Sequence, residues 1–236
     1  MKEKQELGPI EIQLDHFFSV MACVLGIPFF TDQVLGYFIN CFEDSIIQTC
    51  VSNGIMNVTL TVFLFGLYRF QRWPSINPVK MGPIDCVVVG IIGVIQLFLL
   101  VWIISTPWER VLSSLQRILE FECQEQPIII ALRKGLAHEG QLFGIILLVV
   151  ILVPFFEELL FRYFLYRFLK SRMSKLGAIL LTGFIFALLH LNLTAFVPLW
   201  VMGIFLISLY EHHGNLVPCI MVHGLFNYIS ILAVVF

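Results

Sequence analysis

Two carboxylates and a guanidinium stand in a strongly apolar segment of the sequence. Glu157, Glu158 and Arg162 lie within Pro154–Arg162, where every other residue is apolar. Charged side chains at membrane depth are energetically costly, and they usually mark a functional site. The segment is therefore the first candidate for chemistry, and carboxylates at such a place favour acid–base catalysis.

The spacing of these residues indicates different roles for the two carboxylates. Glu158 and Arg162 are four residues apart, so on a helix they share a face and can pair. Glu157 points about 100° away around the same helix and has no cation at pairing distance along it. Glu157 is therefore the better candidate for a general base, and Glu158 for a structural partner of Arg162.

Three more polar residues lie in later apolar segments: His190, His223 and Asn227. His223 and Asn227 are four residues apart, so two hydrogen-bond donors share one helix face and could stabilise an oxyanion. Phe186 precedes His190 by four residues, which would let its ring wall and orient the imidazole.

The composition indicates where these residues are held. The 236 residues are 59% hydrophobic and 13% charged, whereas a soluble domain is about half apolar and a quarter charged. This composition predicts an integral membrane protein. The net charge of −2, without a basic stripe, argues against a nucleic-acid partner. The six cysteines form no C-x-x-C pair, so we interpret them as small hydrophobic residues.

A bilayer core needs about 20 residues of helix, which divides the chain into candidate spans. We predict an all-α, polytopic transmembrane helix bundle of about seven spans, within a range of six to eight. The spans are expected at 16–39, 50–68, 84–104, 141–166, 176–192, 195–210 and 216–236.

The stretch 105–140 is the one substantial segment expected outside the bilayer. Thr106, Pro107 and Glu109 have the pattern of a helix N-terminus with a capping box. Apolar residues follow at helical spacing, which predicts an interfacial amphipathic helix near 107–122.

Alternating passes bring the polar residues to one depth. Basic residues favour a cytoplasmic N-terminus, because most would then lie on that side: Lys2, Lys4, Arg69, Arg72, Lys80, Arg167, Lys170, Arg172 and Lys175. Glu158, His190 and His223 then lie about 14, 21 and 15 Å inside the bilayer. We expect one integrated membrane domain, with N-terminal spans and the surface helix in 1–140 and a catalytic four-helix core in 141–236.

These motifs resemble those of a known family. Glu157-Glu158-x-x-x-Arg162, Phe186-x-x-x-His190 and His223-x-x-x-Asn227 look like the three motifs of the CPBP intramembrane proteases. That family includes CAAX prenyl proteases and bacteriocin-processing proteins. The resemblance covers roughly 141–230 and implies peptide-bond hydrolysis of a membrane-associated peptide or protein, with the lipid bilayer as the other partner.

The resemblance also implies roles for the residues. Glu157 and His190 would position the attacking water, and His223 and Asn227 would face the developing oxyanion. Glu158, Arg162 and Phe186 would support them. The expected location is a bacterial inner (cytoplasmic) membrane.

Two questions remain open at this point: whether the reaction uses a metal, and whether the protein is an enzyme. The family is commonly called a metalloprotease family, and Glu157, His190 and His223 could supply a single catalytic Zn²⁺. The same residues also suffice for glutamate-activated water without a metal, which we favour slightly. A non-catalytic membrane peptide-binding or immunity protein could use the same polar pocket, and a proton-coupled carrier is a third possibility.

Overall fold

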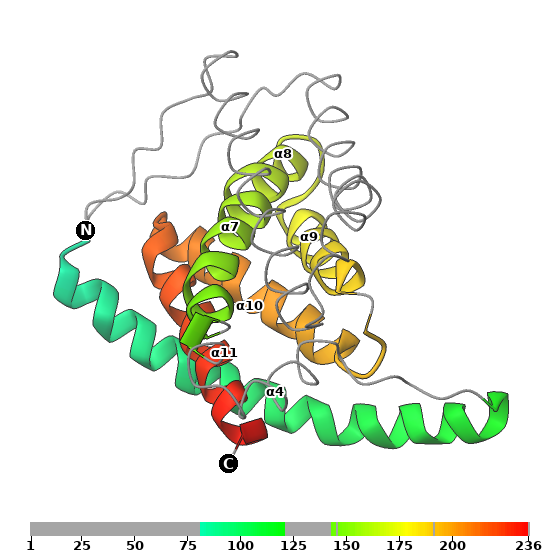
Figure 1. The fold of residues 1–236 in the computed structure, drawn as a ribbon. Helices are drawn as coiled ribbons and strands as arrows, with labels where there is room; N and C mark the ends of the chain where they lie inside the picture. The colour runs from blue at the N-terminus through cyan, green and yellow to red at the C-terminus, as the bar shows by residue number, and fades with distance from the viewer. Residues whose placement is uncertain (1–80, 121–142, 145, 191, 236) are drawn as a thin grey trace, which may run out of the picture. The chain divides into compact units, whose positions relative to one another are not determined.

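The structure, a computed structural model, describes residues 81–120, 143–144, 146–190 and 192–235. All secondary-structure elements in these ranges are helices. The predicted all-α fold is therefore confirmed for this part of the chain (Figure 1). The spans expected at 16–39 and 50–68 lie outside the described residues.

The chain divides into two compact units. The first comprises 1–11, 77–124 and 157–226, and the second comprises 12–76, 125–156 and 227–236. Among the described helices, Pro83–Leu119 and Leu216–Ala233 are long and apolar enough to cross a membrane, and Lys175–Leu189 is a shorter apolar helix.

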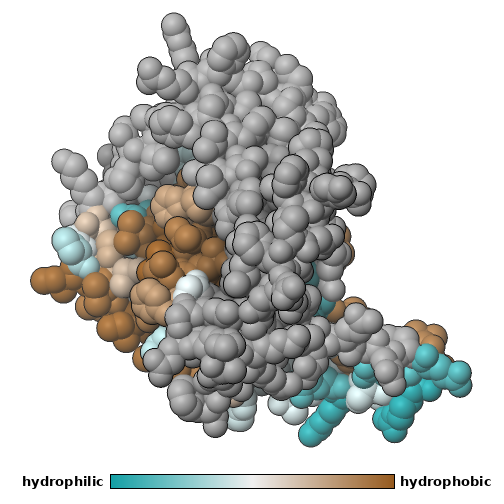
Figure 2. All heavy atoms as spheres, viewed as in Figure 1, coloured by the Kyte–Doolittle hydropathy of each residue, from teal (hydrophilic) through white to brown (hydrophobic). Residues whose placement is uncertain are grey.

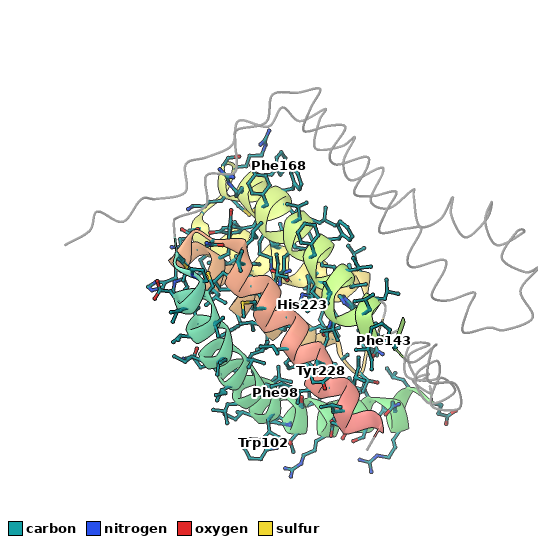
Figure 3. The ribbon with its side chains drawn as sticks, turned by 60° about the vertical axis from the view of Figure 1, so that its left-hand side comes forward. Phe98, Trp102, Phe143, Phe168, His223 and Tyr228 are labelled. Atoms are coloured by element: carbon teal, nitrogen blue, oxygen red, sulfur yellow. The ribbon has the colours of Figure 1, made fainter. Side chains whose placement is uncertain are left out.

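Helix α4 (Pro83–Leu119) presents one narrow stripe to the protein and its other face to the surroundings. Cys86, Gly90, Gly93, Val94 and Leu97 are buried at helical spacing. The opposite residues are exposed and apolar: Ile84, Ile91, Ile92, Ile95, Leu99 and Trp102. Figure 2 shows hydrophobic atoms along the N-terminal half of α4, and Figure 3 shows Trp102 projecting away from the other helices. This face is suited to lipid.

The expected start of a separate surface helix at Pro107 is wrong. α4 runs without interruption through Thr106 and Pro107 for 37 residues, about 55 Å at 1.5 Å per residue. Pro107 removes one backbone hydrogen bond and bends a helix without having to end it, and Figure 1 shows α4 changing direction along its length. In the segment 107–119 the apolar residues Val111, Leu115 and Ile118 are exposed. The interfacial position expected for it stays a prediction.

A continuous helical run carries the two carboxylates. It consists of η2 (Leu148–Leu152), α7 (Val153–Glu158), η3 (Leu159–Tyr166) and α8 (Arg167–Lys170), and η2 and η3 are π-helical. π-Helical turns are rare and occur frequently at functional sites. Glu157 and Glu158 thus end an α-helical segment, and Arg162 lies in a wider one, so a regular 3.6-residue period does not describe this region.

Two further helices pack closely against each other. α9 (Lys175–Leu189) begins where Ser174 Oγ accepts a hydrogen bond from Gly177 N at 3.2 Å. α10 (Phe196–His213) ends at Gly214, whose φ of 61° is favoured by glycine. α11 (Leu216–Val235) follows and packs on α4 at Gly93 in the first unit, where an added Cβ would lie 2.7 Å from Val222 Cγ2.

The crossing of α9 and α10 depends on two glycines. A Cβ built on Gly203 would lie 2.8 Å from Gly183 Cα and 3.4 Å from Phe186 Cδ1. We expect Gly203→Ala to lower stability by about 1–3 kcal/mol, because the two backbones must separate. A thermal melt in detergent measures this change. Gly144→Ala is the control, since a Cβ there meets nothing within 4 Å. Equal melting temperatures for both variants would contradict the close crossing.

Glu211 joins the ends of α8, α9 and η3. Its Oε1 accepts from Lys170 Nζ at 2.7 Å and lies 3.0 Å from Lys175 Nζ, while Tyr166 donates to Oε2 at 2.8 Å. Burial acts to raise the pKa of Glu211, but these hydrogen bonds outweigh it and hold the pKa below its usual value of 4.5.

The lowered pKa of Glu211 predicts a pH-dependent stability. Near pH 4.5 the unfolded chain binds more protons at this group than the folded chain. The stabilisation is therefore fully present above that pH and is lost as the pH falls through the lower folded pKa. Melting curves of the wild type and Glu211→Gln should differ most at neutral pH and converge on acidification. A pH-independent difference would contradict this account.

Candidate active site

Glu158 is the centre of a buried polar cluster. Its Oε2 lies 3.0 Å from Arg162 Nε, with both side chains fully buried, so the pair predicted from their spacing is present. Its Oε1 lies 2.7 Å from His223 Nδ1 on α11. One carboxylate therefore connects the guanidinium of its own helical run to the imidazole of another helix.

Arg162 is held by charge and by aromatic faces. Its Cζ lies 4.9 Å from the centroid of the Phe186 ring and 6.0 Å from that of Phe161. Its contact with Glu158 lacks the alignment of a hydrogen bond, and its two Nη atoms have no hydrogen-bond partner among the described residues. A buried cation of this kind is stabilised by the nearby carboxylate and by cation–π attraction.

Glu157 has a different environment from its neighbour. Its Oε2 lies 3.6 Å from His223 Nε2, and its side chain is 24% exposed whereas that of Glu158 is fully buried. Among the described residues this oxygen has no hydrogen-bond partner. Oε2 itself is buried, but the partly exposed side chain makes Glu157 the more accessible of the two carboxylates.

His223 contacts both carboxylates through opposite sides of its ring. Nδ1 donates to Glu158 Oε1, because a carboxylate only accepts, and Nε2 is thereby directed to Glu157. The edge of the ring packs against Phe186, with centroids 6.0 Å apart. Figure 3 shows His223 on α11 within the helices of the first unit.

The spacing along the sequence did not reveal the contact between Glu158 and His223. The estimated depths placed these residues in one layer, but the rotation of each helix decides which carboxylate contacts which nitrogen of the ring. That rotation leaves no signal in a single sequence.

His190 stands at the end of α9, where its backbone caps the helix. Its Nδ1 lies 2.7 Å from Phe186 O. A carbonyl only accepts, so Nδ1 carries a proton, and in the neutral imidazole Nε2 then has the free lone pair. The Phe186 ring lies 4.7 Å from the imidazole, centroid to centroid. Phe186 therefore orients His190 through its carbonyl as well as through the ring contact expected from sequence.

Asn227 belongs to the second unit. It follows His223 by four residues on α11, and its Nδ2 donates to Val149 O at 3.0 Å. One of its two amide hydrogens is used in this bond, which leaves the other for a further acceptor.

A metal ion would need several His, Cys, Asp or Glu side chains close together at this cluster. Among the described residues no three His, Cys, Asp or Glu side chains gather in a metal-binding arrangement. Glu157 and His223 are close, but His190 does not join them as a third ligand, and His223 Nδ1 is engaged by Glu158. These residues as placed do not form a Zn²⁺ ligand set, and no step below uses a metal.

The fold and the site together define a class of protein. The described residues form helices around a buried acid–histidine–arginine cluster, and two of these helices are long and apolar enough to cross a membrane. These features fit an integral membrane protein with an internal polar site.

Residues 139–229 match the sequence model of the Rce1-like type II CAAX prenyl endopeptidases. This part of the chain is therefore similar to a CAAX protease domain, as its three motifs indicated, and the similarity supports a membrane-embedded peptidase. No curated protein and no solved structure matched the chain.

Proposed function

We propose that the chain is an intramembrane endopeptidase in which Glu157 is the general base. The observation that supports this role is the difference in burial and in partners between the two neighbouring carboxylates. Glu158 is fully buried between Arg162 and His223, whereas Glu157 is partly exposed and has no cation of its own helix. A general base must be reachable by the water that it deprotonates.

The proposed reaction is balanced within these residues. Glu157 takes a proton from water as the water oxygen bonds to the carbonyl carbon of the peptide. The lone pair on His190 Nε2 accepts a hydrogen bond from the second hydrogen of that water, which orients the water molecule. Glu157 then returns its proton to the leaving nitrogen as the C–N bond breaks, which gives an amine and a carboxylic acid. The carboxylic acid releases its remaining proton to His190 Nε2 and becomes a carboxylate.

His223 and Asn227 would stabilise the oxyanion formed in this step. Two hydrogens on the His223 ring would let Nδ1 bond to Glu158 while Nε2 donates to the oxyanion. When Glu157 accepts a proton, negative charge moves from that carboxylate to the oxyanion, and His223 Nε2–H donates to it. Asn227 follows His223 by four residues, and this spacing supports the proposal that it donates a second hydrogen bond.

The domain match suggests the substrate class for the first test. The protein is reconstituted in liposomes with a farnesylated peptide that ends in a CAAX sequence, and an unprenylated peptide is the comparison. We expect mass spectrometry to detect a new terminus in the farnesylated peptide. Peptide that binds the liposomes without cleavage would instead support the non-catalytic binding protein.

The arrangement in the membrane is part of the proposal. We propose seven spans with a cytoplasmic N-terminus in a bacterial inner membrane. The excess of basic residues on the expected cytoplasmic side supports this orientation.

A further inference from the structure

A tryptophan on α4 contacts the turn that follows His190. Trp108 Nε1 donates to Thr194 O at 2.9 Å and to Leu193 O at 3.2 Å, so one N–H is shared between two backbone carbonyls. Both carbonyls belong to the connection between α9 and α10, in the same unit as Trp108. The connection begins at His190, three residues before Leu193.

The other hydrogen bonds of the turn among its described residues are local. Asn192 Oδ1 accepts from Ala195 N at 2.8 Å, and Leu193 O accepts from Phe196 N at 3.3 Å. These bonds shape the turn, but they do not fix it to another helix. Among the hydrogen bonds of the described residues, those from Trp108 connect it to α4.

His190 needs such a connection because it stands at the last turn of its helix. Its backbone N donates to Ala187 O at 3.2 Å, and its ring is fixed by Phe186 O. Helix ends fray unless a neighbouring element holds them. Movement of the turn would break the bond between Nδ1 and Phe186 O and release the other tautomer, in which Nε2 carries the proton.

We propose that Trp108 is a positioning residue that keeps His190 in the Nδ1–H tautomer with Nε2 free. The contribution to catalysis rests on the proposed function, whereas the effect on the tautomer does not. Because Trp108 follows Pro107, the bend of α4 is what places the C-terminal half of this helix relative to the turn.

The chain offers a matched control for this proposal. Trp200 Nε1 donates to Leu180 O at 3.1 Å, which is also a bond from an indole to a helix-bundle carbonyl. Leu180 lies ten residues before His190, in the first half of α9. Trp108→Phe and Trp200→Phe therefore remove the same kind of bond and keep an aromatic ring, but only the bond from Trp108 goes to the turn.

The first measurement is nitrogen-15 NMR of histidine side chains in the reconstituted full-length protein, with the His190 signal assigned by its loss in His190→Ala. We expect the wild type and Trp200→Phe to show one tautomer and Trp108→Phe to show a mixture. A single tautomer in Trp108→Phe overturns the proposal, and so does an equal mixture in both variants. If Trp108→Phe does not fold, Asn192→Ala loosens the same turn and should give the mixture.

The second measurement is cleavage of the farnesylated peptide. We expect Trp108→Phe to lower kcat about tenfold with little change in KM, and Trp200→Phe to retain wild-type kcat. Wild-type kcat in Trp108→Phe overturns the catalytic part. Absence of cleavage by the wild type would contradict the proposed function, while the tautomer measurement would still decide the structural part.

Discussion

Glu157→Gln is expected to abolish most of the cleavage activity, with a loss of about 10²–10⁴ in kcat, because general-base catalysis contributes a factor of that size. The variant keeps the volume of the side chain and removes its ability to take a proton. Its folding should change little, since Glu157 is partly exposed and is not the partner of Arg162. Initial rates in proteoliposomes measure the loss, and a thermal melt tests the fold.

Glu120→Gln is the control for this experiment. Glu120 is an exposed glutamate at the end of α4, so the same chemical change there should leave kcat unaltered. Wild-type cleavage by Glu157→Gln would exclude Glu157 as the base. A melting temperature far below that of the wild type would instead show that Glu157 is mainly structural.

Glu158→Leu is expected to destabilise the protein by about 3–5 kcal/mol, because it leaves the buried Arg162 cation without its carboxylate. It should also remove activity, since His223 Nδ1 loses the acceptor that orients the ring. Denaturation in detergent measures the first effect, and peptide cleavage measures the second.

The double variant Glu158→Leu/Arg162→Leu separates these two effects. Replacing both members of a buried ion pair by apolar residues often restores stability. We therefore expect the double variant to recover much of the melting temperature but none of the activity. Recovered activity would show that His223 needs no acceptor at Nδ1, and a wild-type melting temperature in Glu158→Leu alone would show that the ion pair contributes no stability.

The spacing of residues along the helices was enough to predict several contacts of the site. The four-residue separation predicted the pair of Glu158 with Arg162 and the contact of Phe186 with His190, and both are present. Such pairs are predictable because residues four apart on a helix face one another whatever the rest of the fold does.

The helix boundary at Pro107 was predicted wrongly because a local sequence pattern does not distinguish a helix start from a bend. Thr106, Pro107 and Glu109 satisfy the local pattern of a helix start, but α4 continues through them. A proline at the first position of a helix and one within a bent helix look alike in sequence. Contacts such as those of Trp108 with Leu193 and Thr194 accompany the continuous form, and they join residues more than eighty positions apart.

The sequence by itself determined that this is a helical membrane protein with a protease-type set of polar residues, because composition, apolar run length and motif spacing are local properties of the chain. The tertiary structure alone decided that His223 bonds to Glu158 through Nδ1 and faces Glu157 through Nε2, and that Trp108 bonds to the turn after His190. Those contacts depend on how far each helix is rotated about its axis and where π-helical turns change its period. Packing against the other helices sets both, and residue spacing along one helix does not.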